Sequence, residues 1–294
     1  MTTADPQLTT AEGRSAVVVR HRFPHPPQHV WRGITETDSL AAWFPGAAEI
    51  EPRIGGTVRY PGAEGTDAGH GTVLACDPPH LLAFTWDTDT LTFTLEADGD
   101  GTVLTLTHAF DDHAGAASFA TGWEACLAGL AQVADGAEVT DPGPQRDRHE
   151  ELARRFELGA PVVLESSAGW SVRFERQLVC DAVTAWELFL TGADPVDPAP
   201  VQELVIGGEL RAPKAPEVVL GEIRRLDPPH LLAFAPGSEE PGDEVRLELR
   251  PGTGHGARLV LTVDGTEPAE REAAIEQWGS GAVEAIAAAA LRVG

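Results

Sequence analysis

The feature that most constrains the fold of this chain is an internal repeat. Residues 77–84 have the sequence DPPHLLAF, and residues 227–234 repeat it without a change, at an offset of 150 (227 − 77). Weaker matches keep the same order at slightly larger offsets, such as Trp123 and Trp278 at 155 (278 − 123). Offsets that drift in this way result from insertions and deletions in loops. The chain therefore consists of two diverged copies of one domain, which are too few copies for a solenoid.

The length of 294 residues is about twice that of a typical domain, which agrees with two copies. Between the copies, the sequence DPGP at 141–144 is rich in turn-forming residues, and a highly charged run follows it. This composition is typical of a linker that carries a solvated helix. We expect a first domain at residues 1–135, a charged linker at 136–160 and a second domain at 161–294.

The charge of the chain is strongly acidic. It has 46 acidic and 21 basic residues, a formal net charge of −25. Binding to nucleic acids and to anionic membranes requires clustered cations, so we expect neither partner. The chain has 3 widely spaced cysteines and no CxxC pair, so neither a disulfide framework nor a zinc site is expected, and no metal or cofactor. Because no signal peptide or membrane span is evident, we expect a cytoplasmic protein. Its oligomeric state is left open.

Hydrophobic periodicity predicts the same order of elements in both copies. In the first copy, strands are expected at 16–23, 47–51, 57–60, 72–76, 81–86, 91–95 and 102–108, with short helices between the first two. Short connections make the sheet antiparallel, and an amphipathic C-terminal helix must cover it. In the second copy, the sequence GSG at 279–281 interrupts the last helix. Those glycines are either a tolerated kink or a thinning of the helix that leaves space beneath it.

A set of residues in the first copy has a characteristic order and spacing: Phe23, Val30, Trp31, Leu40, Trp43, Phe44, Pro45, Gly55, Gly56, Gly71, Val73, Asp77, Pro78, Pro79, residues 104–108, Gly122, Trp123 and Glu124. This order and spacing resemble the SRPBCC superfamily, also called START-like, Bet v 1-like or helix-grip domains. The nearest branch is the one named after the activator of Hsp90 ATPase. The second copy resembles it more loosely, because residues 191–201 replace the Trp-Phe-Pro element with Asp and Pro residues.

The resemblance implies an α+β fold of two tandem helix-grip domains. In each, a curved antiparallel sheet of seven strands would wrap around the long C-terminal helix and enclose an apolar cavity. Members of the superfamily bind lipids, hormones, polyketides and other hydrophobic molecules, and some are aromatases or cyclases. Tandem members occur in actinomycetes, some in gene clusters for antibiotics that include enediynes.

Strand alternation selects the residues that point towards the helix and therefore into any cavity. His108 is a polar member of this inward set, and Val263 stands at its place in the second copy. Two interpretations of His108 stay open: a hydrogen-bonded core residue, or a group that contacts a ligand or moves protons. For the aromatic candidates the alternative is ordinary core packing. The expected ligand-binding residues are Tyr60, Phe84, Trp86, Phe93, Leu106, His108, Trp123, Phe234 and Trp278.

Three functions are compatible with the sequence. The first is a binding protein for a hydrophobic small molecule, such as a polyketide or polyene intermediate in natural-product biosynthesis. The second is a cyclase- or aromatase-like enzyme, in which His108, Tyr60 or Arg59 would move protons. The third is a chaperone-interaction module. Motifs of the common hydrolase, nucleotide-binding and metalloprotease families are absent from the sequence, so no catalytic residue is assigned.

Overall fold

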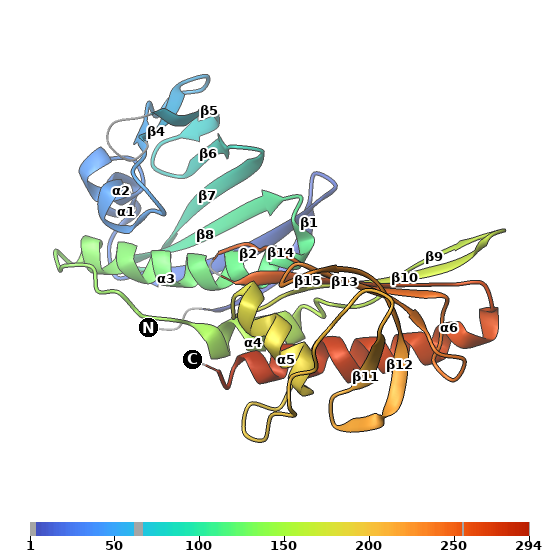
Figure 1. Cartoon of the computed structure of the whole chain (residues 1–294). Coiled ribbons are helices and arrows are strands. Elements are labelled where there is room, and N and C mark those ends of the chain that lie inside the picture. The colour runs from blue at the N-terminus through green and yellow to red at the C-terminus, as the bar shows by residue number, and fades with distance from the viewer. Residues whose placement is uncertain (1–3, 62–66, 255, 294) are drawn as a thin grey trace. The chain divides into compact units, whose positions relative to one another are not determined.

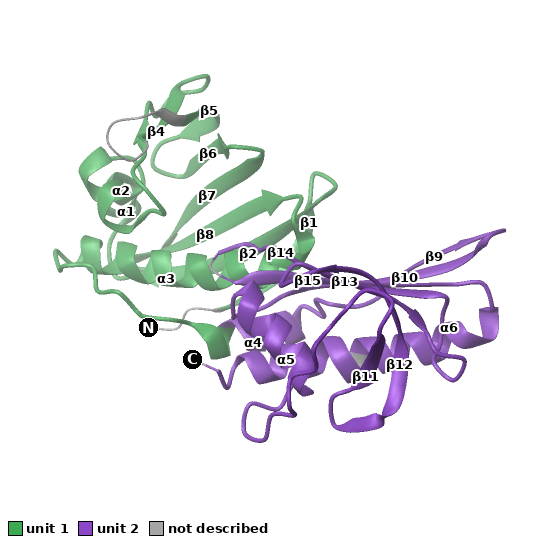
Figure 2. Ribbon diagram, in the orientation of Figure 1, with its two compact units in different colours: residues 1–148 green, residues 149–294 purple. Residues whose placement is uncertain are grey.

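The computed structural model describes residues 4–61, 67–254 and 256–293. The chain forms two compact units, residues 1–148 and 149–294 (Figure 2). The boundary falls within helix α4 (Arg146–Arg155), inside the segment expected to be a linker. Glu150 of this helix is buried in the second unit, where its carboxylate accepts a hydrogen bond of 2.6 Å from Nη2 of Arg176. Part of the expected linker is therefore integrated into the second unit.

The first unit is an antiparallel sheet in the order β1-β2-β8-β7-β6-β5-β4-β3, covered by helix α3 (Figure 1). The strands are β1 (Ala4–Ala11), β2 (Arg14–Phe23), β3 (Glu49–Ile50), β4 (Thr57–Pro61), β5 (Asp67–Asp77), β6 (Leu81–Trp86), β7 (Asp89–Asp98) and β8 (Gly101–Phe110). The helices are α1 (Pro27–Gly33), α2 (Thr37–Trp43), the 3-10 turn η2 (His113–Gly115) and α3 (Ala116–Ala134). Pro27 lies in the first turn of α1, where a missing N–H leaves no hydrogen bond unmade.

The first sheet has eight strands, not the seven that the resemblance implies. The additional strand is β1, which pairs with β2 across a tight turn at Glu12 and Gly13. Both turn residues are left-handed, with φ of 53° and 81°, as a two-residue hairpin turn requires. The sequence of β1, ADPQLTTA, has no apolar alternation because the strand lies at the sheet edge, so periodicity does not reveal it.

The second unit repeats the architecture with the sheet order β11-β12-β13-β14-β15-β10-β9. The strands are β9 (Val162–Ser166), β10 (Gly169–Gln177), β11 (Glu209–Ala212), β12 (Ala215–Asp227), β13 (Leu231–Pro236), β14 (Glu244–Pro251) and β15 (Ala257–Gly265). Helix α5 (Ala182–Thr191) is capped at its N-terminus by Asp181, whose side chain accepts from the Thr184 N–H. Gly192, with a left-handed backbone, caps its C-terminus. Within the described parts of the chain, no helix is both long and apolar enough to cross a membrane.

The C-terminal helix of the second unit is not a continuous α-helix. It consists of η3 (Pro268–Glu270), α6 (Arg271–Ala274), a π-helical stretch η4 (Ile275–Val283) and α7 (Glu284–Ala290). Trp278 and Trp123 correspond at an offset of 155, and each is 3% exposed. Beyond them the buried residues correspond at 156 (283 − 127 and 286 − 130), because Leu127 matches Val283 and Leu130 matches Ile286. We infer that the wider π-turn accommodates one inserted residue while the same helix face stays on the sheet.

Candidate ligand-binding cavity

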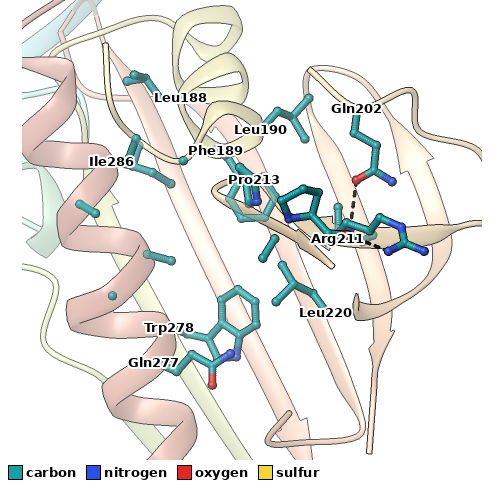
Figure 3. A pocket seen from close by; sticks show the side chains of 18 of the residues that line it. Leu188, Phe189, Leu190, Gln202, Arg211, Pro213, Leu220, Gln277, Trp278 and Ile286 are labelled. Atoms are coloured by element: carbon teal, nitrogen blue, oxygen red, sulfur yellow. Dashed lines mark hydrogen bonds between the residues drawn. The ribbon is translucent and has the colours of Figure 1, made fainter. Parts of the chain in front are cut away.

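The second unit contains a partly open cavity of about 410 Å³ between its C-terminal helix, α5 and the β11–β12 hairpin. Figure 3 shows Trp278 and Ile286 on the helix, opposite Leu220 and Pro213 of the hairpin. A cavity of this volume lies in the range of about 300–1,000 Å³ that holds small-molecule ligands. The lining residues are mainly apolar: Leu188, Phe189, Leu190, Gly192, Ala193, Pro200, Gln202, Leu210, Arg211, Ala212, Pro213, Pro216, Leu220, Gln277, Trp278, Gly281, Ala282, Ala285 and Ile286.

The two glycines of the π-helical stretch have different roles. A Cβ on Gly279 would lie 2.6 Å from Cε1 of Phe174, so this glycine allows the helix to approach β10. A Cβ on Gly281 would meet only the Glu276 carbonyl oxygen, at 3.7 Å, and Gly281 lines the cavity. Of the two sequence interpretations, the structure therefore favours a helix thinned of side chains beside a space.

Three polar side chains line the cavity, and each already bonds to the protein. Gln202 accepts from the Arg211 N–H at 3.0 Å and donates to the Glu209 carbonyl. The guanidinium of Arg211 donates to the Pro216 carbonyl at 2.7 Å and to the Glu209 carboxylate. The side-chain amide of Gln277 donates to the carboxylate of Glu240. The bonds of Gln202 and Arg211 hold the hairpin, and that of Gln277 joins the helix to the β13–β14 connection. All three leave the cavity with a mainly apolar surface.

Trp278 is the one predicted site residue that lines this cavity. Its indole lies 5.7 Å from the ring of Phe234, measured between centroids, so two of the predicted residues are neighbours in the second unit. The indole N–H of Trp278 is buried and has no hydrogen-bond partner. Such a donor costs about 1–3 kcal/mol when left unsatisfied.

In the first unit, the equivalent tryptophan is part of a buried hydrogen-bond network. The indole N–H of Trp123 donates to Nδ1 of His108 at 3.0 Å. Since an indole can only donate, Nδ1 carries no proton and the imidazole is neutral, with its proton on Nε2. That nitrogen lies 3.0 Å from the Asp89 carboxylate, which also contacts Arg14 at 3.2 Å. Both nitrogens of the fully buried His108 are therefore engaged within the protein.

The other predicted residues of the first unit pack around this network. Trp86 lies about 6 Å from both His108 and Trp123, with centroid distances of 6.0 and 5.9 Å. Phe84 and Phe93 stack on each other at 6.0 Å, and Leu106 is fully buried. Tyr60 donates its hydroxyl to the Thr85 carbonyl at 2.7 Å, and burial raises the pKa of this phenol above its usual value. Whether any of these residues contacts a ligand stays a prediction.

Sequence reasoning did not find the residues of α5 and the β11–β12 hairpin that line the cavity. From the sequence, residues 191–201 show only a departure from the family pattern, although Gly192, Ala193 and Pro200 lie in the cavity wall. The one sequence feature that indicates the cavity is GSG at 279–281, because Gly281 lines it. Among the described residues, no group of three or more His, Cys, Asp or Glu side chains is arranged to hold a metal ion.

Comparison with known proteins identifies the family of the first unit. Residues 24–135 match the family model described as activator of Hsp90 ATPase homolog 1-like protein. The first unit belongs to this family. The internal repeat and the matching strand order make the chain a tandem protein of the same α+β helix-grip type. No curated protein matches the chain.

Several solved structures are similar to about half of this chain. CalU16 from Micromonospora echinospora is 24% identical, with a TM-score of 0.43 over 53% of this chain and 99% of that chain. A conserved protein of unknown function from Enterococcus faecalis is 24% identical, with a TM-score of 0.40 over 52% and 88% of the two chains. A protein from Bordetella parapertussis is 24% identical, with a TM-score of 0.37 over 53% and 94%.

Proposed function

We propose that this chain binds a hydrophobic small molecule in the cavity of the second unit. The observation that carries this proposal is a partly open cavity of about 410 Å³ with a mainly apolar lining. Transfer of apolar ligand surface from water into such a space contributes about 25 cal/mol per Å². Within this class we propose a polyketide- or polyene-type natural product, on the basis of the sequence resemblance to tandem actinomycete proteins.

The contacts of the candidate proton-transfer groups support a binding protein over a cyclase. His108 bonds through both ring nitrogens, and Tyr60 donates its hydroxyl to a backbone carbonyl. Arg59 projects into solvent and lies 3.8 Å from the carboxylate of Glu49. A general acid or base must instead reach the atom that it protonates or deprotonates.

The test uses the neutral polyene diphenylhexatriene, whose fluorescence rises in an apolar environment. We expect micromolar or tighter binding and a higher melting temperature, because a ligand that binds only the folded state stabilises it. Ala285→Phe places a ring in the cavity wall and should weaken binding by about tenfold or more, while Ala288→Phe on the exposed face of α7 should not. No binding to the wild type, or equal binding by both variants, would contradict the proposal.

A further inference from the structure

We propose that the cavity selects neutral ligands and rejects carboxylic acids, because Glu209 neutralises the cationic side chain in its wall. This inference rests on the proposed function and specifies its ligand class. Among the described lining residues there is no Asp, Glu, Lys or His, and Arg211 is the one charged side chain. An arginine beside an apolar cavity would by itself favour an acid, because guanidinium binds carboxylate strongly.

The guanidinium of Arg211 is already bonded in a way that disfavours an added acid. Glu209 and Arg211 stand two residues apart on β11, so their side chains project on the same side of the strand. One guanidinium nitrogen donates to the Glu209 carboxylate and another to the Pro216 carbonyl. A ligand carboxylate would therefore meet a guanidinium that already donates to other acceptors, and it would be repelled by the negative charge of Glu209.

The backbone around this pair is fixed by Gln202. Its side-chain oxygen accepts from the Arg211 N–H at 3.0 Å, and its amide donates to the carbonyl of Glu209. One side chain thus bonds to the backbone of both members of the ion pair. An acid would therefore have to displace Glu209 from Arg211 before it could pair there.

An amine is disfavoured for a different reason. Since no carboxylate lines the cavity, a buried ammonium would have no counter-charge there, and burial of an unpaired charge is strongly unfavourable. The net charge of −25 repels acids further at low salt, but it adds no partner for an amine inside the cavity. The ligand class that remains is neutral and mainly apolar, such as an alcohol, ketone, ester or hydrocarbon.

The experiment is displacement of diphenylhexatriene from the full chain by medium-chain alcohols and the corresponding acids and amines. All are used at neutral pH, below their critical micelle concentrations. We expect each alcohol to bind about tenfold or more tightly than the acid of equal length. Glu209→Gln leaves Arg211 without its carboxylate partner, so acids should gain about tenfold in affinity while alcohols change by less than about twofold.

The control variant is Glu217→Gln, which removes one negative charge from the neighbouring strand β12 without touching the Arg211 pair. It should leave the preference for alcohols unchanged, which separates the local pair from the overall charge. Acids that displace the probe as well as alcohols do, no displacement by any alcohol, or no gain for acids in Glu209→Gln would each overturn the inference. If diphenylhexatriene itself binds, those results contradict the inference but not the proposed function. If the probe does not bind, both are contradicted.

Discussion

The tryptophans Trp123 and Trp278 occupy the same place in the two copies, and they have opposite surroundings. Each is 3% exposed and stands on the C-terminal helix of its unit. Trp123 donates to His108, which in turn contacts Asp89. Trp278 has no acceptor for its N–H, because Val263 stands where the first unit has its histidine, and its indole lines a cavity.

This difference shows how one scaffold supports two kinds of interior. Around Trp123, the rings of Phe44, Trp86 and His108 lie within 5.9 Å, measured between centroids. A satisfied polar network of this kind fixes a single arrangement of the core. Around Trp278 the helix widens and carries small residues, so space remains beneath it.

The largest expected effect comes from breaking the network of the first unit. His108→Val leaves the Trp123 N–H and the Asp89 carboxylate without this partner, which should destabilise the unit by about 2–4 kcal/mol. Urea unfolding measures the change. Thr107→Val, the next residue on β8 with its side chain on the opposite face, should cost far less. Diphenylhexatriene binding should be unaffected, and a loss of affinity in His108→Val would place a ligand in the first unit instead.

An intermediate effect should follow from removing the inserted residue. Deletion of Gly281 returns Val283 and Ile286 to the spacing from Trp278 that Leu127 and Leu130 have from Trp123, so an α-helix can form without exposing the buried face. The narrower helix should close part of the cavity and weaken diphenylhexatriene binding by about tenfold.

Gly281→Ala is the matched control for this deletion. It keeps the residue count, and its Cβ would approach nothing closer than the Glu276 oxygen at 3.7 Å. Because it adds only one methyl group to the cavity wall, it should weaken probe binding far less than the deletion does, and it should gain up to about 1 kcal/mol of stability from helix propensity. A deletion variant that unfolds, or one that binds like the wild type, would contradict the assignment of one inserted residue.

The sequence was sufficient for the repeat, for an antiparallel sheet in each copy and for the inward direction of His108. It did not reveal β1, whose residues lack alternation, or the location of the described cavity. Alternation identifies which side chains face inward, but it does not tell whether they fill the space. That depends on volumes contributed by distant segments, such as Pro213 of the hairpin and Ala285 of the helix. The aromatic and imidazole residues favour a ligand site in the first copy, whereas the described cavity of the second unit is lined by small residues such as Gly281 and Ala285.

The smallest expected effect would convert the second interior towards the first. Val263→His places an imidazole where Trp278 supplies an unused N–H donor. Asp243 stands at the register position of Asp89, because Val245 pairs with Val263 as Leu91 pairs with His108. We expect its carboxylate, which accepts from the Thr266 hydroxyl at 2.9 Å, to be the second partner.

The control for this substitution is Val245→His, which buries the same group on the facing strand away from the place that His108 holds in the first unit. Both substitutions overfill a packed site and bury a polar ring, so both should destabilise the unit. Val263→His should cost about 1 kcal/mol less than Val245→His, because its imidazole can accept from the indole and donate to the carboxylate. The measurement is urea unfolding of the two variants side by side. Equal losses of unfolding free energy would show that the indole N–H of Trp278 does not bond to the new histidine as that of Trp123 bonds to His108.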